Sequence, residues 1–332
     1  MQNKGTKTGR VTGRLAPSPT GALHLGNARS FLIAWLSVRS QGGRLVMRME
    51  DLDHPKVKPG AAEAIFEDLR WLGLDWDEGP DVGGPSGPYV QTQRRGLYRE
   101  ALGRLQAAGR VYPCVCSRAD VTGAQSAPHA EDGQALRYPG TCRGRFASWD
   151  DAVAALPANR LPVWRFRVDA GVSEFEDVFY GRHMLDPSEV TGDFALARDP
   201  DGASYMLAVV VDDAEMGVTE VVRGDDLLDA THSQLALQQA LGLSPPRYMH
   251  VPLVVAGDGH RLAKRHGDTR LVALREAGLL PEQIVGLLAW WCGWAAFGEH
   301  LMPAELVSRY DLTTLAHGPV VLTQDIKEFL RL

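Results

Sequence analysis

Apolar and polar positions along the first 110 residues predict strands and helices in alternation. Residues 11–15 form a short apolar run that predicts a strand, and residues 44–49 predict a second strand that ends in acidic side chains. Residues 26–40 and 59–72 carry apolar side chains at helical spacing. An order of strand, helix, strand and helix is typical of a parallel α/β sheet, so we predict this architecture for the N-terminal part of the chain.

This alternation stops at residue 113. Residues 113–146 carry three cysteines within a polar stretch, where we predict little regular structure. Two apolar runs, at 163–168 and 175–180, predict strands in the same region. We therefore expect an insertion that interrupts the α/β unit.

Strand and helix return after a turn at 199–202. Residues 218–224 predict a strand, and residues 231–241 predict a helix that ends at Gly242. The 65 residues from 268 to 332 have a helical pattern. The predicted divisions are a disordered N-terminus (1–9), two halves of the sheet domain (10–112 and 199–256), the insertion (113–198) and a helical C-terminal segment (257–332).

Composition and charge limit the class of protein. The 332 residues are 45% hydrophobic and 23% charged, as in a soluble globular protein that can bury a core. A net charge of −6 means that a nucleic-acid partner must meet a local basic surface. The uncharged stretch 283–298 is shorter than the roughly 20 residues of a membrane span, and the basic N-terminus leads into no apolar signal region. We expect a cytoplasmic protein with reduced cysteines and no membrane partner.

Two short segments suggest that the chain binds a nucleoside triphosphate. His24-Leu25-Gly26-Asn27 stands where a loop becomes a helix, and a helix N-terminus favours phosphate. Gly26 lets the backbone approach a ligand, and the side chains of His24 and Asn27 can donate hydrogen bonds. Lys264 lies in the basic stretch GDGHRLAKRHG and supplies a point charge for phosphate. Taken alone, each segment also fits a capped helix or a solvated basic loop.

Together these segments resemble the two signatures of the class I aminoacyl-tRNA synthetases. HLGN resembles the first signature, and RLAKR resembles the second, usually written KMSKS, with Lys264 in the place of the catalytic lysine. Arg261, Ala263 and Arg265 depart from that pattern. The resemblance implies a Rossmann-type parallel-sheet catalytic domain, ATP accompanied by Mg²⁺, and catalytic roles for His24, Asn27 and Lys264. It also implies that Gly26 helps His24 and Lys264 to bind ATP.

A wider resemblance points to the glutamyl branch of this class. The segments GRLAPSPTGALHLGNAR, RMEDLD, YMLAVVVDDAEMGVTEVVRGDDLL and RLAKRHG occur in the order of that family. A glutamate pocket needs cations for two carboxylates and an anion for one ammonium, and arginine pairs with carboxylates in bidentate geometry. The resemblance leaves open which arginine binds the side-chain carboxylate. By resemblance, the positions that contact glutamate are Arg14, Ala16, Ser18, Glu50, Tyr205 and Arg223.

The insertion contains a candidate zinc site. Zinc takes four ligands in tetrahedral geometry and prefers thiolates, and Cys114, Cys116 and Cys142 supply three. His129 and Tyr138 are both chemically possible as the fourth ligand, and three buried free cysteines without metal are the alternative. Enzymes that glutamylate queuosine carry Cys-x-Cys followed by Tyr-x-x-x-Cys, so the resemblance implies Tyr138 and one structural Zn²⁺.

The short C-terminal segment narrows the function further. It can form a stem-contact segment, but it is too short to add an anticodon-binding domain of about 100 residues. The chain thus resembles the truncated glutamyl paralogues that activate glutamate without tRNA and transfer it to queuosine in the anticodon loop of tRNA(Asp). The alternatives are a shortened glutamyl-tRNA(Glu) synthetase and a catalytically inactive synthetase-like RNA-binding module. We expect a monomer.

Overall fold

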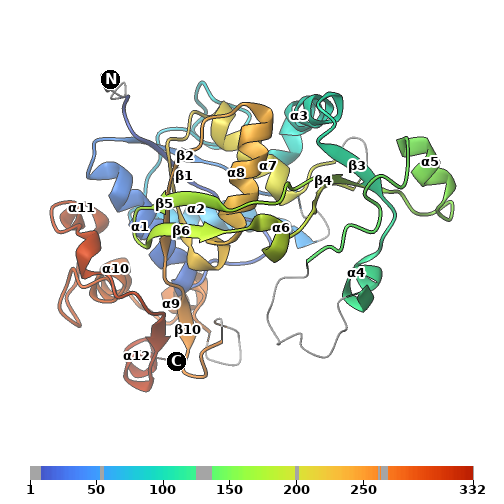
Figure 1. The fold of residues 1–332 in the computed structure, drawn as a ribbon. Coiled ribbons are helices and arrows are strands. Elements are labelled where there is room, and N and C mark those ends of the chain that lie inside the picture. Colours follow the sequence, from blue (N-terminus) through green and yellow to red (C-terminus); the bar gives the residue numbers. More distant parts are fainter. Residues whose placement is uncertain are drawn as a thin grey trace, which may run out of the picture. The chain divides into compact units, whose positions relative to one another are not determined.

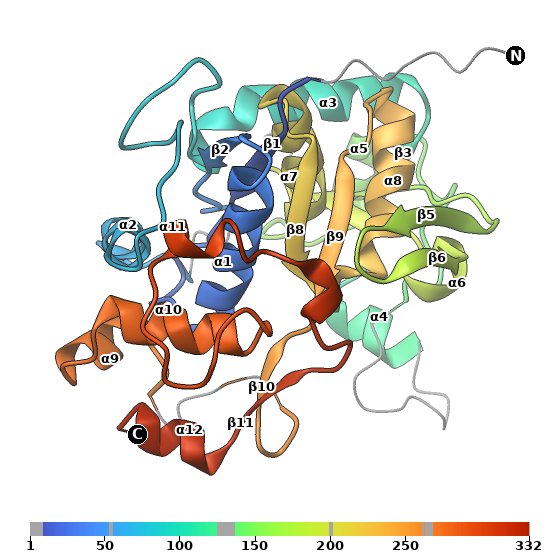
Figure 2. The same ribbon diagram turned by 90° about the vertical axis from the view of Figure 1, so that its left-hand side faces the viewer.

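A computed structural model describes residues 9–52, 56–124, 137–198, 202–260, 262 and 268–331. The chain, drawn in Figures 1 and 2, forms two compact units. The first unit comprises Met1–Tyr89, Gly217–Asp225 and Arg247–Leu332, and the second comprises Val90–Met216 and Asp226–Pro246. The predicted insertion therefore lies in the second unit, together with segments on either side of it.

Parallel strands form the centre of the first unit. The strands are β1 (Thr12–Leu15) paired with β2 (Arg44–Met47), and β8 (Glu220–Gly224) paired with β9 (Arg247–Val251). The Thr219 N–H donates to the Thr12 carbonyl at 2.8 Å, and the Arg14 guanidinium donates to the Val222 carbonyl at 2.9 Å. The residue numbers of the two contacts increase together, from Thr12 to Arg14 in β1 and from Thr219, which precedes β8, to Val222 within it. The two strands therefore run side by side in the same direction. The carboxyl ends of the four strands therefore share one edge.

Helices and a second strand pair complete the first unit. The helices are α1 (Leu25–Arg39), α2 (Ala61–Trp71), α9 (Leu271–Glu276), α10 (Pro281–Trp290), α11 (Pro303–Leu306), the 3₁₀ turn η5 (Leu312–Thr314) and α12 (Gln324–Phe329). The fully buried Leu32, Ile33 and Leu36 lie on α1, which contacts β1, β8 and α10. β10 (Val254–Ala256) and β11 (Val320–Leu322) pair in parallel. The regular structure of the C-terminal segment is thus mainly helical, as predicted, but the segment also contributes a strand.

An antiparallel sheet and a hairpin organise the second unit. Strand β4 (Val163–Phe166) lies between β3 (Val111–Cys114) and β7 (Phe194–Ala197), and β5 (Ser173–Asp177) pairs with β6 (Gly181–Leu185). The helices are η2 (Gln91–Arg94), α3 (Arg95–Ala107), α4 (Arg118–Ala124), α5 (Trp149–Ala154), α6 (Pro187–Val190), α7 (Tyr205–Glu215) and α8 (Ala230–Leu241). The short η3 (Asp225–Leu227) is where the chain passes from the first unit to the second.

A buried carboxylate joins the helices of the second unit. Asp212 on α7 has no exposed side-chain surface and accepts hydrogen bonds from Gln91 at 2.8 Å and from the Arg94 guanidinium at 2.6 Å. The Tyr98 hydroxyl donates to both of its oxygens at 2.9–3.0 Å. Buried charges persist when they are paired in this way, so α7 is held against η2 and α3.

Most predicted elements are confirmed, and the differences concern short segments. The strand expected at 175–180 is instead the hairpin of β5 and β6, and α4 occupies part of a stretch for which little regular structure was predicted. Strands β3, β7, β9, β10 and β11 were not predicted. Cys292 is fully buried, as expected of a core residue. Among the described residues, none of the helices has the length and apolar character that crossing a bilayer requires.

The carboxyl of Asp68 on α2 gives the first unit a pH-dependent stability. Its side chain is 2% exposed, its Oδ2 has no hydrogen-bond partner, and the Arg275 guanidinium lies 3.8 Å from Oδ1. Burial raises the pKa of Asp68 to about 6, although Arg275 opposes the shift. The unfolded chain loses this proton near pH 4, so the folded chain holds more protons between pH 4 and 6 and its stability falls as pH rises through that window.

We predict that Asp68→Asn removes this pH dependence. Its free energy of unfolding should exceed that of the wild type by about 2–3 kcal/mol at pH 8 and should match it near pH 4. Urea denaturation at both pH values measures the difference. Glu63→Gln, on an exposed residue of the same helix, is the matched control. A pH profile that Asp68→Asn leaves unchanged contradicts this account.

Candidate active site and metal centre

His24 and Asn27 form a reciprocal cap at the start of α1. The Gly26 N–H donates to Nδ1 of His24 at 3.1 Å, and the His24 N–H donates to Oδ1 of Asn27 at 3.3 Å. A Cβ on residue 26 would lie 3.0 Å from Cε1 of His24, so Gly26 leaves room for the imidazole ring to fold back over the helix. The sequence predicted Gly26 for close approach of a ligand, and its closest described neighbour is the ring of His24.

This cap determines which donors the helix N-terminus presents. Burial lowers the pKa of His24, so the ring is neutral near pH 7. Because Nδ1 accepts a hydrogen bond, the proton of the neutral ring is on Nε2. In the same way, Oδ1 of Asn27 is an acceptor and its amide nitrogen is the donor. Both side chains therefore combine a capping acceptor with a donor, at a helix end that favours anions.

Lys264, Arg261, Ala263 and Arg265 lie outside the described residues, but the segments that flank them contact α1. The Leu25 N–H donates to the Thr269 carbonyl at 3.1 Å, and the Leu271 N–H donates to the Leu23 carbonyl at 2.9 Å. On the other flank, the buried Arg29 of α1 donates to the Pro252 carbonyl at 2.7 Å. The segment from Leu23 to Arg29, which contains the first signature, is therefore hydrogen-bonded to the chain on both sides of the second signature.

The first unit brings together five of the six expected glutamate positions. Arg14 and Arg223 stand near the carboxyl ends of β1 and β8, and Glu50 follows β2. The Glu50 N–H donates to the Pro17 carbonyl at 3.0 Å, which fixes Glu50 beside the loop that carries the expected positions Ala16 and Ser18. In open parallel sheets, this edge is where ligands bind.

Sequence analysis did not identify Arg48. Its guanidinium is fully buried and donates to Oε1 of Glu50 at 2.9 Å. Arg48 and Glu50 lie two positions apart just after β2, and this spacing of a cation and an anion is the signal that could have found the pair. Arg48 therefore holds the Glu50 carboxylate in place.

His250 is a second residue that sequence analysis missed. It lies opposite Arg223 in the register of β8 and β9, and its Nε2 accepts from Nε of Arg223 at 2.9 Å. The Arg223 guanidinium also lies over the Tyr248 ring, 5.2 Å from the ring centre. Both neighbours come from β9, a strand that was not predicted. Together they fix the orientation of a buried cation at the edge of the sheet.

Tyr205, the sixth expected glutamate position, belongs to the second unit. It is the first residue of α7, and 36% of its surface is exposed. The N-cap Ser204 donates from its hydroxyl to the Ala195 carbonyl at 2.8 Å, which ties the start of α7 to β7. The phenol is thus presented at a fixed helix start.

The three cysteines of the insertion form one cluster with Tyr138. The sulfur atoms of Cys114, Cys116 and Cys142 lie within 4.8 Å of one another, and those of Cys116 and Cys142 are 3.6 Å apart. The Tyr138 oxygen lies 3.2 Å from the sulfur of Cys114 and 3.6 Å from that of Cys116. His129, the other candidate ligand, lies outside the described residues.

These distances fit a tetrahedral metal ion. Zinc–sulfur bonds of about 2.3 Å place two sulfur ligands about 3.8 Å apart. Burial raises the pKa of both Cys116 and Tyr138, whereas at Cys142 hydrogen bonds outweigh burial and lower the pKa of the thiol. The donor set is therefore suited to zinc, with three sulfurs and a phenol oxygen.

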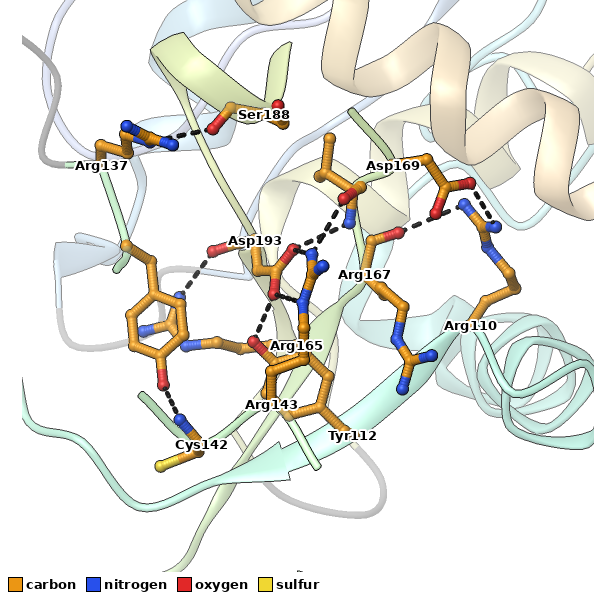
Figure 3. A network of polar contacts seen from close by, with 12 residues as sticks. Arg110, Tyr112, Arg137, Cys142, Arg143, Arg165, Arg167, Asp169, Ser188 and Asp193 are labelled. Carbon is orange, nitrogen blue, oxygen red and sulfur yellow. Dashed lines mark hydrogen bonds and ion pairs between the residues drawn. The ribbon is translucent and has the colours of Figure 1, made fainter. Parts of the chain in front are cut away.

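Local backbone geometry brings the tyrosine to the cysteines. Gly140 has a φ of +79°, and the turn over residues 138–142 lets the Cys142 N–H donate to the Tyr138 oxygen at 2.8 Å. Gly192, with a φ of +64°, approaches the Tyr138 backbone so closely that a Cβ would lie 2.8 Å from its carbonyl oxygen. Figure 3 shows the Tyr138–Cys142 contact beside the arginine-rich network of the unit.

Known proteins resemble the chain over nearly its whole length. Residues 10–325 match the family model described as tRNA synthetases class I (E and Q), catalytic domain. A Glutamyl-Q tRNA(Asp) synthetase from Symbiobacterium thermophilum is 49% identical over 310 residues, which cover 93% of this chain and 95% of that protein. A Glutamate--tRNA ligase from Heliobacterium modesticaldum is 40% identical and matches over 93% of this chain but 62% of its own length.

Solved structures support the same assignment. The crystal structure of a glutamate-tRNA synthetase from Elizabethkingia anophelis superposes with a TM-score of 0.82 and 27% identity, over 97% of this chain and 70% of that one. The α/β fold with parallel strands is thus shared with that synthetase. The chain therefore belongs to the class I tRNA synthetases for glutamate and glutamine, which are ligases, and within them to the glutamyl-Q tRNA(Asp) synthetase group.

Proposed function

We propose that this enzyme activates glutamate with ATP in the absence of tRNA and then transfers the glutamyl group to queuosine in the anticodon loop of tRNA(Asp). The observation that carries the proposal is the similarity to a Glutamyl-Q tRNA(Asp) synthetase. The two sequences are 49% identical over a stretch that covers 95% of that protein. A shortened glutamyl-tRNA(Glu) synthetase is the second candidate. It has less support, because the match to a glutamate--tRNA ligase is 40% identical and covers 62% of that protein.

The activation step needs positioned donors. A glutamate α-carboxylate oxygen attacks the α-phosphorus of ATP, the bond to the β-phosphate bridging oxygen breaks, and pyrophosphate leaves. In this proposal the N–H groups of His24 and Asn27 bind phosphate oxygens at the start of α1, and Lys264 neutralises the leaving group. One well-placed donor supplies roughly 3 kcal/mol, or 10²–10³ in rate. Mg²⁺ bound with ATP contributes further neutralisation of phosphate charge.

Glutamate recognition follows from the charges at the sheet edge. The guanidinium groups of Arg14 and Arg223 are suited to the two carboxylates, and Glu50 is suited to the ammonium. The Tyr205 hydroxyl, Ser18 and the backbone at Ala16 add hydrogen bonds. Since Arg48 and His250 already hold Glu50 and Arg223, the two charged groups need little reorganisation when the amino acid binds.

The second step is an acyl transfer. A hydroxyl oxygen of queuosine attacks the carbonyl carbon of glutamyl-adenylate, an ester forms, and AMP leaves with the bonding electron pair. Arg145 lies in the same insertion as the cysteine cluster and is suited to RNA phosphates, whereas Arg137 pairs with Glu189 and Arg143 pairs with Asp193.

We also propose one structural zinc ion, held by Cys114, Cys116, Tyr138 and Cys142. The sulfur and oxygen separations described above support it. The ion would join the start of the insertion, which carries Cys114 and Cys116, to the segment that carries Tyr138 and Cys142. It would take no part in the chemistry of glutamate.

Pyrophosphate exchange tests the proposed reaction. We predict glutamate-dependent exchange between ATP and pyrophosphate without any tRNA, and transfer of labelled glutamate to tRNA(Asp) that carries queuosine. Queuosine-free tRNA(Asp) and tRNA(Glu) are the controls and should accept none. Exchange that requires tRNA(Glu) would favour the shortened synthetase, and absence of both reactions would favour the inactive module.

His250 provides a test of how Arg223 is oriented. We predict that His250→Ala raises KM for glutamate in the exchange reaction about tenfold, because the lost acceptor lets the Arg223 guanidinium rotate. KM for ATP should stay within twofold. His250→Gln, which restores an acceptor, should recover most of the loss. An equal rise in both KM values would mean that the substitution disturbs the unit as a whole.

Metal analysis tests the zinc site. We predict one zinc ion per chain, lost on treatment with a strong chelator at low pH, and its loss in Cys142→Ala. The apparent affinity should rise with pH, because thiols and phenol must lose protons to bind the metal. Cys292→Ala is the matched control, since that buried thiol lies outside the cluster, and it should retain zinc. A wild-type chain that binds no zinc contradicts the proposed site.

A further inference from the structure

Arg165 contacts two members of the cysteine–tyrosine cluster. It lies on β4 opposite Tyr112 of β3, and its Nε donates to the sulfur of Cys114 at 3.2 Å. The centre of its guanidinium lies 3.8 Å from the centre of the Tyr138 ring. Figure 3 shows Arg165 beside the tyrosine ring that faces Cys142. One cation therefore touches both a sulfur and the ring of the phenol.

A second nitrogen of the Arg165 guanidinium is held in place by a backbone carbonyl. Its NH1 nitrogen donates to the Asp193 carbonyl oxygen at 3.1 Å. The Asp193 carboxylate itself is occupied, because it accepts from the Tyr112 hydroxyl at 2.5 Å, from Nε of Arg143 at 2.9 Å and from the Val168 N–H at 2.8 Å (Figure 3). Asp193 therefore fixes the position of Arg165 without pairing with its charge.

The half-buried guanidinium of Arg165 has no carboxylate partner among the described residues. A partly desolvated cation of this kind is costly unless an anion compensates it. Three thiolates, one phenolate and Zn²⁺ would together carry a net charge of −2. The metal-loaded cluster is therefore the counter-ion that Arg165 lacks.

We propose that Arg165 is the outer partner of the metal centre, and the proposal rests on the zinc site proposed above. Its N–H donates to the Cys114 thiolate, and its guanidinium covers the Tyr138 ring and favours the phenolate. Groups that donate hydrogen bonds to metal ligands raise metal affinity and fix ligand orientation. Arg165 thereby also favours the tyrosine as fourth ligand, since it neutralises the charge that a phenolate adds.

Metal titration of the chelator-stripped protein tests this role. We expect Arg165→Met to weaken zinc binding 10- to 100-fold, measured by competition with a chromophoric chelator. Arg165→Lys keeps a charge without the planar donor and should lie between the wild type and Arg165→Met. Arg167→Met is the matched control, because Arg167 is two residues further along and does not contact the cluster (Figure 3). It should bind zinc as the wild type does.

A second readout reports on the ligands directly. Cobalt substitution gives a thiolate-to-cobalt charge-transfer band, and ultraviolet difference spectra report ionisation of Tyr138 when metal binds. We expect the tyrosinate signal to weaken in Arg165→Met while the thiolate band remains. Wild-type zinc affinity and tyrosinate signal in Arg165→Met would overturn the proposal. So would a variant whose metal-free form unfolds at a lower urea concentration but whose zinc affinity is unchanged. A wild-type chain that binds neither metal would instead reject the zinc site itself.

Discussion

The hydrogen bond from the Gly26 N–H to Nδ1 of His24 constrains the chemistry at the start of α1. It uses one ring nitrogen to cap the start of the helix, so the other nitrogen must carry the proton of the neutral ring. Burial of His24 keeps the ring in that form. Asn27 divides its two amide atoms in the same way. A helix start that would otherwise need separate capping and ligand-binding side chains therefore serves both purposes with two residues.

The charged side chains at the sheet edge are held by a second layer of residues. Arg48 holds Glu50 from two positions earlier in the segment that follows β2, and His250 holds Arg223 from the neighbouring strand. In the insertion, Asp193 performs the corresponding task for Arg165 through its backbone. In each case a polar contact fixes the orientation of a charged side chain before any ligand binds. Such preorganisation reduces the entropy cost of binding.

The sequence was most informative where chemistry and spacing coincide. The first signature, the acids after β2 and the cysteine spacing were all visible as patterns, and the structure gathers Arg14, Glu50 and Arg223 in one unit and the cysteines with Tyr138 in the other. Arg48 and His250 were missed because their value depends on strand register. β11 was missed because a three-residue strand is stabilised by a distant partner and not by its own periodicity. The expected domain limits remain predictions.

The ligands of the cysteine cluster enter it from two well-anchored ends. Cys114 ends β3, and Tyr138 is held by the close approach of Gly192 and by the Cys142 N–H. The geometry of the cluster is therefore independent of how many residues join Cys116 to Tyr138. Loop-closure entropy grows slowly with length, so this connection can gain or lose residues at small cost. It offers a position for a genetically inserted reporter that leaves both ends of the connection intact.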